Sequence, residues 1–361
     1  MNSEGFSVLA TGNPKTFRVA FTADLYRADG APQYRDLGLD VLDADAAIAH
    51  GPLAEYRAEL TADQLRDANA AIVLAPRVTA ASVAEAHDLL AIGRFGVGYD
   101  SVDVAACTAA DVLLFIAAGA VDRSVAEATV GWMLALTHHV RAKDRLVRAG
   151  EWDRRSSYMG GELRDRTLGA IGLGGIARTL VKLLSNFGMK PPLAYDPFVD
   201  SAVAASCGVK LVLLDELLST ADFVSVHCPL NADTRNLLGA AQLARMKRDA
   251  YLINTARGGI VDEDALYAVL AEGKIAGAAI DCFVGEPVVR PHRFGTFDNV
   301  LLAPHAIAWT DELFRDIGRT ACRGMVALSR GERPHGVVNP EVFDRPAFLA
   351  KWSRLRTAAV N

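Results

Sequence analysis

Residues Leu168–Ala177, LGAIGLGGIA, give the clearest indication of the fold of this chain. The apolar run Leu168–Ile171 predicts a buried strand, and the glycines after it open a helix that extends to about Asn186. In a G-x-G-x-x-A turn the first glycine permits a tight bend and the second lets a phosphate approach the backbone. The small third residue lets the helix pack closely on the strand. The stretch therefore predicts a helix N-terminus that binds the pyrophosphate of a dinucleotide.

An acidic residue, Asp196, comes at the end of the next short predicted strand, Leu193–Tyr195. A carboxylate in that place accepts hydrogen bonds from the ribose hydroxyls of the adenosine and repels a 2′-phosphate, which favours NAD over NADP. The alternative interpretation is that Asp196 is only a turn residue before Pro197. The preceding fingerprint favours the cofactor role.

Apolar runs alternate with helical patterns along nearly the whole chain. This alternation predicts βα units and parallel sheets. The further predicted strands are Arg18–Thr22, Ala71–Ala75, Ile92–Gly96, Val112–Phe115, Val209–Val212, Phe223–Val226, Tyr251–Ile253, Ala278–Ile280 and Val300–Leu302. The predicted helices include Thr79–Leu90, Ser101–Ala110, Asp262–Glu272 and Thr310–Arg330, the last with Thr310 as N-cap.

One long helix is predicted between the two strand series. A capping box at Ser124–Glu127 marks its start and Gly150 its end. This helix and the one at Thr310 are the expected crossings between two doubly wound α/β domains with a cleft between them. The expected substrate domain is discontinuous, residues 1–121 and 309–361, and the expected cofactor domain spans residues 122–308.

Composition narrows the class of protein. The chain has 361 residues, 51% of them hydrophobic, which is enough for two cores. A net charge of −5 without a basic stripe argues against nucleic-acid binding. No uncharged apolar stretch reaches the ~20 residues of a membrane span, and no signal peptide is evident. Five scattered cysteines without a CxxC pair fit neither a disulfide framework nor a structural zinc site, so we expect a cytoplasmic protein.

Several polar residues directly follow predicted strands, at the edge where open α/β sheets bind ligands. Each alone has an ordinary interpretation, such as a solvated arginine, a loop glutamate or a core histidine. Their joint placement on one edge, together with the fingerprint, favours a functional site. These residues are His227, Asn254, Arg257, Asp281, Glu286 and His305.

Eight stretches spread over the chain carry a family resemblance. They are Gly96–Asp103, Ser124–Glu127, Leu168–Ile176, Tyr195–Pro197, His227–Leu230, Ile253–Asp262, Asp281–Pro287 and Pro304–His305. In these motifs the sequence resembles the D-isomer-specific 2-hydroxyacid dehydrogenases. The resemblance implies a Rossmann cofactor domain inserted into a flavodoxin-like substrate domain. It also implies NAD as cofactor, a small 2-oxo or D-2-hydroxy acid as substrate, and a homodimer joined near Trp132–Trp152.

The resemblance further implies a catalytic set of Arg257, Glu286 and His305. Protonated His305 would donate the proton when a 2-oxo acid is reduced, and the neutral ring would accept it in the reverse direction. Glu286 would stabilise the imidazolium, and Arg257 would hold the substrate carboxylate and polarise its carbonyl. No metal is expected, because arginine and imidazolium supply the electrophilic assistance.

The remaining site residues are implied in the same way. The Val97–Gly98 loop, with Tyr99 near the cleft, would bind the substrate carboxylate through backbone N–H groups, unless it is a simple glycine turn. His227 would be structural or a loose cofactor contact. The residues expected to hold NAD are Gly172, Gly174, Gly175, Ile176, Asp196, Pro229, Thr255, Ala256, Asp281 and Ala308.

Because of two departures from the family pattern, the sequence does not identify the substrate. Ile116–Gly119 stands where many members have Asn-Thr-Pro-Gly, and Ala306–Trp309 replaces a usual glycine-rich run. Trp309 would narrow the pocket, stack on substrate or, as we favour, pack between domains. Glu286 argues against the formate dehydrogenases, which carry glutamine there. Alternatives of other kinds are a non-catalytic NAD(H)-sensing regulator and an enzyme of another substrate class such as phosphite.

Overall fold

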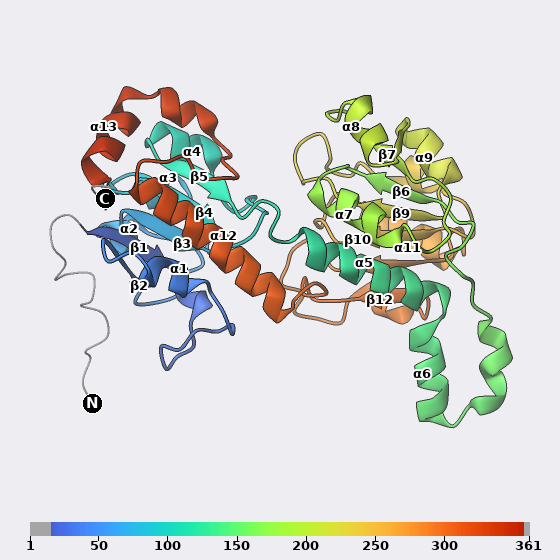
Figure 1. Ribbon diagram of the computed structural model, residues 1–361. Helices are drawn as coiled ribbons and strands as arrows, with labels where there is room; N and C mark the ends of the chain where they lie inside the picture. The colour runs from blue at the N-terminus through green and yellow to red at the C-terminus, as the bar shows by residue number, and fades with distance from the viewer. Residues whose placement is uncertain (1–15, 357–361) are drawn as a thin grey trace. The chain divides into compact units, whose positions relative to one another are not determined.

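Two units, each built around one parallel sheet, make up the chain (Figure 1). The computed structural model describes residues 16–356. The first unit comprises Met1–Val121 and Thr310–Asn361, and the second comprises Asp122–Trp309. Among the described residues, no helix has the length and apolar character needed to cross a membrane.

Five parallel strands form the sheet of the first unit, in the order β2-β1-β3-β4-β5. This is the strand order of a flavodoxin-like doubly wound sheet and confirms that part of the predicted fold class. The strands are β1 (Phe17–Phe21), β2 (Ile48–Pro52), β3 (Ala70–Val73), β4 (Ala91–Arg94) and β5 (Leu113–Ile116).

Mostly short helices connect these strands, and one long helix completes the unit. Thr310 is the N-cap of the long helix as predicted, because its Oγ1 accepts a hydrogen bond of 3.1 Å from the N–H of Leu313. The helices are η1 (Ala23–Leu25), α1 (Leu39–Asp43), α2 (Ala62–Leu65), α3 (Ala80–Val83), α4 (Val104–Ala109), α12 (Asp311–Ser329), η4 (Pro340–Asp344) and α13 (Pro346–Leu355).

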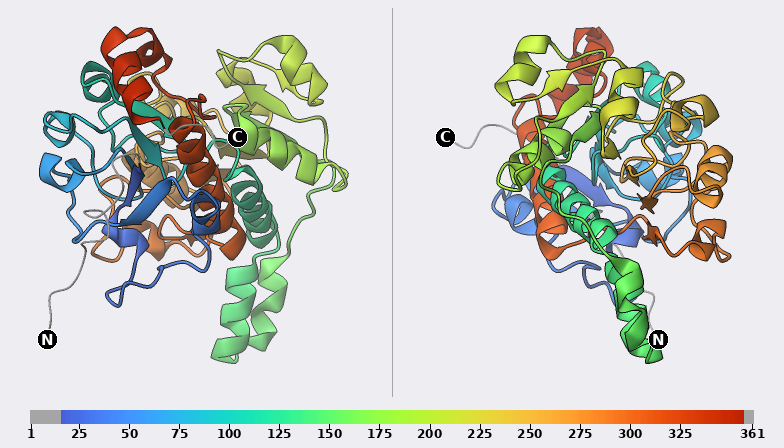
Figure 2. Two further views of the ribbon diagram at one scale, coloured as in Figure 1. Left: turned by 60° about the vertical axis from the view of Figure 1, so that its left-hand side comes forward. Right: turned by 90° about the vertical axis from the view of Figure 1, so that its right-hand side faces the viewer.

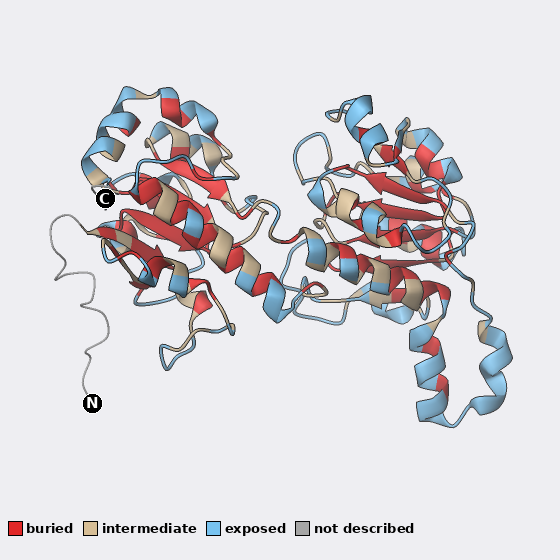
Figure 3. Ribbon diagram, viewed as in Figure 1, coloured by how far each residue is buried: buried red, intermediate tan, exposed pale blue. Residues whose placement is uncertain are grey.

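Seven parallel strands form the sheet of the second unit, in the order β12-β11-β10-β9-β6-β7-β8. The chain crosses over after the first three strands, as in a Rossmann sheet, and confirms the predicted cofactor fold. Its central strands are buried on both faces (Figure 3). The strands are β6 (Leu168–Ile171), β7 (Leu193–Tyr195), β8 (Lys210–Leu211), β9 (Phe223–Val226), β10 (Tyr251–Asn254), β11 (Gly277–Ile280) and β12 (Val300–Leu302).

Helices cover both faces of this sheet. The long helix α5 packs against α7 (Figure 2). Both helices bury apolar side chains together with residues of β9 and β10. The helices are α5 (Asp122–Thr137), α6 (Val140–Ala149), η2 (Trp152–Tyr158), α7 (Gly175–Leu184), α8 (Ser201–Ser206), α9 (Leu214–Thr220), α10 (Ala240–Leu243), α11 (Glu263–Ala271) and η3 (Arg293–Thr296).

The predicted long helix from Ser124 to Gly150 is wrong in two respects. The helix begins at Asp122, so Ser124 lies inside its first turn and is not an N-cap. It is also broken, because His139 adopts a left-handed conformation, with φ of 53°, and is the N-cap of a separate helix, α6. Gly150 ends α6 with φ of 71°, which confirms it as the C-terminal glycine.

Two further differences concern the first unit. The predicted helix Thr79–Leu90 is a single turn, α3, after which the chain turns so that the fully buried Leu89 and Leu90 can lead into β4. Strand β2 was missed, because it pairs only with β1 at the sheet edge and contains Gly51 and Pro52 in place of an apolar run.

Candidate active site

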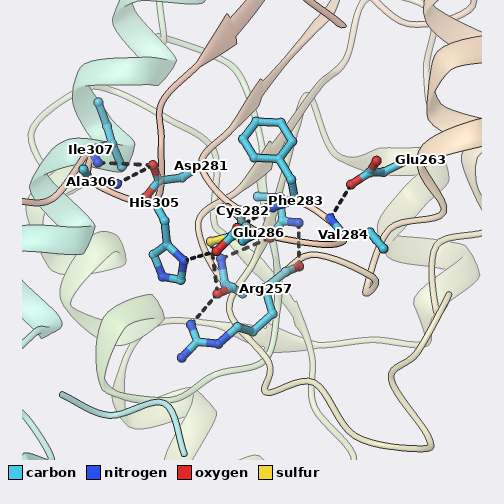
Figure 4. Close-up of polar contacts among 12 residues, drawn as sticks. Arg257, Glu263, Asp281, Cys282, Phe283, Val284, Glu286, His305, Ala306 and Ile307 are labelled. Carbon is cyan, nitrogen blue, oxygen red and sulfur yellow. Dashed lines mark hydrogen bonds and ion pairs between the residues drawn. The ribbon is translucent and has the colours of Figure 1, made fainter. Parts of the chain in front are cut away.

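An imidazole–carboxylate pair lies at the carboxyl edge of the second sheet. Nδ1 of His305, in the loop after β12, is 2.8 Å from Oε2 of Glu286, in the loop after β11 (Figure 4). The other oxygen of Glu286 accepts a hydrogen bond of 2.6 Å from the N–H of Phe283. This second bond fixes the carboxylate, so Glu286 orients the ring of His305.

Asp281 holds the loop that carries His305. Its carbonyl oxygen accepts the N–H of His305 at 2.7 Å, and its Oδ1 accepts the N–H groups of Ala306 at 2.9 Å and Ile307 at 3.2 Å. His305 has a φ of 54°, a conformation that non-glycine residues adopt at a cost and that these bonds maintain. Asp281 was predicted as a cofactor contact, and its support of the His305 loop was not anticipated.

The two carboxyl groups of this edge have opposite pKa shifts. Burial raises the pKa of Asp281 above its usual 3.8, although the hydrogen bonds from Ala306 and Ile307 act in the other direction. Burial would also raise the pKa of Glu286. There the hydrogen bonds from His305 and Phe283 and the charges of His305 and Arg257 outweigh burial and hold the pKa below 4.5. Glu286 is therefore an anion at neutral pH.

The side chain of Asn254, at the end of β10, positions Arg257 through two backbone hydrogen bonds, which we call the Asn254 clamp. The buried Asn254 donates a hydrogen bond of 2.9 Å to the carbonyl oxygen of Arg257 and accepts one of 3.1 Å from the N–H of Ala256. Nη1 of Arg257 donates to the carbonyl oxygen of Ala256 at 2.6 Å. The sequence singled out Asn254 as a polar residue after a strand, but its clamping role depends on side-chain geometry.

Two more contacts tie the loop after β11 to its surroundings. Sγ of the buried Cys282 donates to the carbonyl oxygen of Ala256 at 3.4 Å. Oε1 of Glu263, at the start of α11, accepts the N–H of Val284 at 2.7 Å. The loops that carry Arg257 and Glu286 are thus joined to each other and to α11. No pattern in the sequence pointed to Glu263.

The dinucleotide fingerprint has the local geometry that its sequence predicts. Gly172 has a φ of 91°, and a Cβ there would lie 2.8 Å from the N of Cys228. Gly174 borders open space, whereas a Cβ on Gly175 would collide with the carboxylate of Asp122. Helix α7 begins at Gly175 without a side-chain N-cap, which leaves its first N–H groups for another acceptor.

Asp196 accepts two backbone hydrogen bonds, one from the glycine-rich turn and one from its own turn. Its Oδ2 accepts the N–H of Leu173, within the glycine-rich turn, at 2.8 Å, and its Oδ1 accepts the N–H of Phe198 at 2.9 Å. The second bond is the turn interaction. The first places the carboxylate against the fingerprint, where a ribose would lie.

The other predicted cofactor residues lie around the same edge. The Oγ1 of Thr255 is buried and has no hydrogen-bond partner among the described residues, as expected if a bound group supplies one. With the uncapped helix and the open side of Gly174, this orphan oxygen fits a nicotinamide dinucleotide. Pro229 is exposed, Ile176 is partly exposed and Ala308 is buried.

His227 follows β9, and its Nε2 is 2.8 Å from Oγ of Ser225. Burial lowers its pKa to about 4. A ring that stays neutral and bonds to its own strand favours the structural role over an acid–base role.

The predicted substrate loop belongs to the other unit. Val97, Gly98 and Tyr99 follow β4, and the carbonyl oxygen of Gly98 accepts a hydrogen bond of 2.7 Å from Nε of Arg94. The Arg94 guanidinium also donates to the carbonyl oxygen of Val73 at 2.7 Å, so this loop is fixed to the sheet below it. Within the second unit, Glu286 pairs with His305, and the charge of Arg257 acts on Glu286 (Figure 4).

Comparison with known proteins finds a matching family model and similar proteins. Residues 130–306 match the "D-isomer specific 2-hydroxyacid dehydrogenase, NAD binding domain". The chain is 40% identical over 279 residues to the D-3-phosphoglycerate dehydrogenase of Methanocaldococcus jannaschii, covering 77% of this chain and 53% of that protein. It is 38% identical over 290 residues to the glyoxylate reductase of Thermofilum pendens, covering 77% of this chain and 84% of that protein. The chain thus spans about half the length of the first of these relatives.

A solved structure supports the same grouping. The D-lactate dehydrogenase of Aquifex aeolicus, crystallised with NAD and lactic acid, is similar over 87% of this chain and 96% of its own length. The TM-score is 0.73 and the sequence identity is 26%. The likeness extends over both units, because neither unit alone reaches that share of the chain.

Proposed function

Because the chain belongs to the D-isomer-specific 2-hydroxyacid dehydrogenase family, we propose that it interconverts a small 2-oxo acid and the matching D-2-hydroxy acid, with NAD as the hydride carrier. The observation that carries the proposal is the 2.8 Å pair of His305 and Glu286, on the sheet edge that also presents the dinucleotide fingerprint. Arg257, whose charge acts on Glu286, completes the set.

The cofactor half of the site follows from the residues that fit it. The N–H groups at the start of α7, beside Gly174 and Gly175, would hold the pyrophosphate, and Asp196 would hold the ribose. Asp281 and Thr255, whose buried Oγ1 has no hydrogen-bond partner within residues 16–356, would contact the nicotinamide end. NAD, when bound, supplies the hydride acceptor or donor of the reaction.

His305 is proposed as the acid–base group. Its Nδ1 is held by ionised Glu286, which leaves Nε2 for the substrate oxygen. In the reducing direction Nε2 donates a proton to the oxygen on which charge develops, and in the oxidising direction it removes the hydroxyl proton. Glu286 stabilises the imidazolium form electrostatically while keeping its own negative charge.

Arg257 is proposed to bind the substrate. A planar guanidinium forms two parallel hydrogen bonds to a carboxylate and also polarises a neighbouring carbonyl. The Asn254 clamp keeps its backbone in one conformation, which limits the rearrangement needed on binding. The backbone N–H groups of Val97–Tyr99 are proposed as a second hold on the carboxylate.

The test is turnover with purified protein. We expect NADH to be consumed with a subset of a broad panel of 2-oxo acids, and NAD to be reduced with the matching D-2-hydroxy acids but not the L-isomers. Arg257→Ala and His305→Ala should abolish most of this activity, with Arg248→Ala, an arginine outside the site, as the control. No turnover across the panel, including phosphite, together with NADH-dependent binding of a protein, would instead favour the regulator.

We also infer a homodimer formed through the second unit. Helices α6 and η2 project from the body of that unit (Figure 1), and they expose Val147 and Trp152 to solvent. Such apolar side chains on a protruding pair are typical of an interface. Light scattering should give twice the chain mass, and Trp152→Glu should lower it.

All five cysteines are free thiols, which supports a cytoplasmic location.

A further inference from the structure

A cysteine thiol lies beside the His305–Glu286 pair. Cys282 is buried in the loop after β11, next to Asp281. Its Sγ, a carboxylate oxygen of Glu286 and a ring nitrogen of His305 all lie within 4.8 Å of one another. Figure 4 shows the three side chains converging from two neighbouring loops of the same unit.

The three atoms form a donor set with a specific chemical preference. Thiolate, imidazole and carboxylate together are ligands of Zn²⁺, whereas Mg²⁺ and Ca²⁺ prefer oxygen alone. Around a tetrahedral zinc ion, ligand atoms at about 2.0–2.3 Å from the metal lie about 3.3–3.7 Å apart. Separations of at most 4.8 Å therefore require only small side-chain movements, and a water molecule would complete the fourth position.

The loops around this cluster are already fixed. The N–H of Phe283 holds the carboxylate of Glu286, and the carbonyl oxygen of Asp281 holds the backbone of His305. To bind an ion, the thiol must give up its weak hydrogen bond of 3.4 Å to the carbonyl oxygen of Ala256, and His305 and Glu286 must give up the one between them. Preformed ligands reduce the ordering cost of binding an ion.

We propose that Cys282, Glu286 and His305 form an inhibitory binding site for Zn²⁺. The ion forms bonds to sulfur, oxygen and nitrogen. The thiol proton goes to solvent, and the Nδ1 proton that His305 shares with Glu286 moves to Nε2 when the ring is neutral or to solvent when the ring is protonated. No electron is transferred. A metal-bound imidazole cannot carry protons on both nitrogens, so His305 can no longer act as the acid.

This inhibitory role differs from catalysis by a metal, which the sequence analysis does not predict. The inhibition rests on the proposed function, because it requires His305 to be the acid–base group. The binding does not, since it follows from the donor cluster alone. The two parts are therefore measured separately.

Binding is tested on metal-free protein without cofactor or substrate. Titration with Co²⁺ should produce one equivalent of a near-ultraviolet sulfur-to-cobalt charge-transfer band, and Zn²⁺ should abolish it. In Cys282→Val the band should be absent. Zinc affinity should fall more than ~100-fold, because a direct ligand matters more than the outer partners whose loss costs roughly 10–100-fold. His305→Gln should weaken zinc binding while keeping the thiol.

Cys207→Ser is the matched control, because Cys207 is a partly exposed thiol at the end of α8. It should retain the band and the zinc affinity of the wild type. Cys282→Ser, closer in size to cysteine, replaces Cys282→Val if that variant does not fold. A band that persists without the Cys282 sulfur, or disappears in Cys207→Ser, would overturn the site.

Inhibition is then measured on the active enzyme. Zn²⁺ should inhibit wild type and Cys207→Ser reversibly, with activity restored by a chelator. Cys282→Val, compared with its own metal-free rate, should need more than ~100-fold more Zn²⁺ for half-inhibition. Cobalt binding at Cys282 without zinc inhibition of a working dehydrogenase would overturn the inhibitory role but keep the proposed function. Absence of turnover would refute that function and, with it, the inhibition.

Discussion

The backbone N–H of His305 donates a hydrogen bond of 2.7 Å to the carbonyl oxygen of Asp281, the residue that follows strand β11. The carboxylate of Asp281 receives the next two N–H groups of the same loop. A residue expected only to contact the cofactor therefore also determines where the proposed acid–base group stands.

Replacing Asp281 by alanine should lower kcat about 100-fold, because a displacement of about 1 Å of a reacting group costs that much. Asp281→Asn should lose less, since its amide oxygen can still accept the N–H groups of Ala306 and Ile307. Steady-state kinetics separate the roles. A change confined to the KM for NADH, with kcat intact in both variants, would leave Asp281 as a cofactor contact only.

Asp196→Asn should reduce the preference for NAD over NADP. The neutral amide keeps an acceptor for the N–H of Leu173, so the glycine-rich turn is retained, but the repulsion of a 2′-phosphate is lost. We expect the ratio of kcat/KM values for the two cofactors to fall by at least ~10-fold, equivalent to ~1.4 kcal/mol. An unchanged ratio would mean that Asp196 serves only the turn.

Glu286 should make the fold sensitive to acid. Its pKa in the folded state lies below the 4.5 of an ordinary glutamate, so the unfolded chain takes up the proton first as the pH falls. The stabilisation is complete above pH 4.5 and is lost as the pH drops through the folded-state pKa. Thermal melting should show a smaller loss of stability in this range for Glu286→Gln than for wild type. If the stability of the two proteins fell with pH in the same way, the lowered pKa of Glu286 would be contradicted.

His227 should make the stability of the fold depend on pH in a second, higher range. Burial lowers its pKa from 6.5 to about 4, so the unfolded chain binds the proton first between these values. Stability is therefore highest above pH 6.5 and falls by at most about 3 kcal/mol as the pH drops to 4. His227→Gln should flatten this part of the curve in denaturant titrations. It should not remove activity, since the ring is not proposed to transfer protons.

The sequence predicted much of the second unit, because its strands are short, apolar and bounded by clear turns. The predicted limits of β6, β7, β9 and β12 coincide with the observed ones. The edge strand β2 was missed, because it has no apolar run. The break at His139 was missed too, because a left-handed histidine leaves no mark in the apolar pattern.

The same contrast holds for the site. Parallel strands bring their carboxyl ends to one edge, so the meeting of Glu286 and His305 could be expected from their positions after β11 and β12. The clamp by Asn254 and the anchor from Glu263 could not be predicted, since both depend on side chains that bond to the backbone of particular loops. The thiol of Cys282 likewise becomes notable only when its distance to the pair is known.

The most direct test of the central claim follows a deuterium atom through the reaction. The enzyme is given a 2-oxo acid that it accepts and NADH that carries deuterium at both C4 positions of the nicotinamide, and the product is analysed for configuration and label. Direct hydride transfer with proton donation by His305 predicts a D-2-hydroxy acid that carries one deuterium at C2. The rate should fall by ~10²–10⁴ in His305→Gln, the range typical of a lost general acid. An unlabelled or L-configured product, or a His305→Gln variant as fast as wild type, would contradict the account.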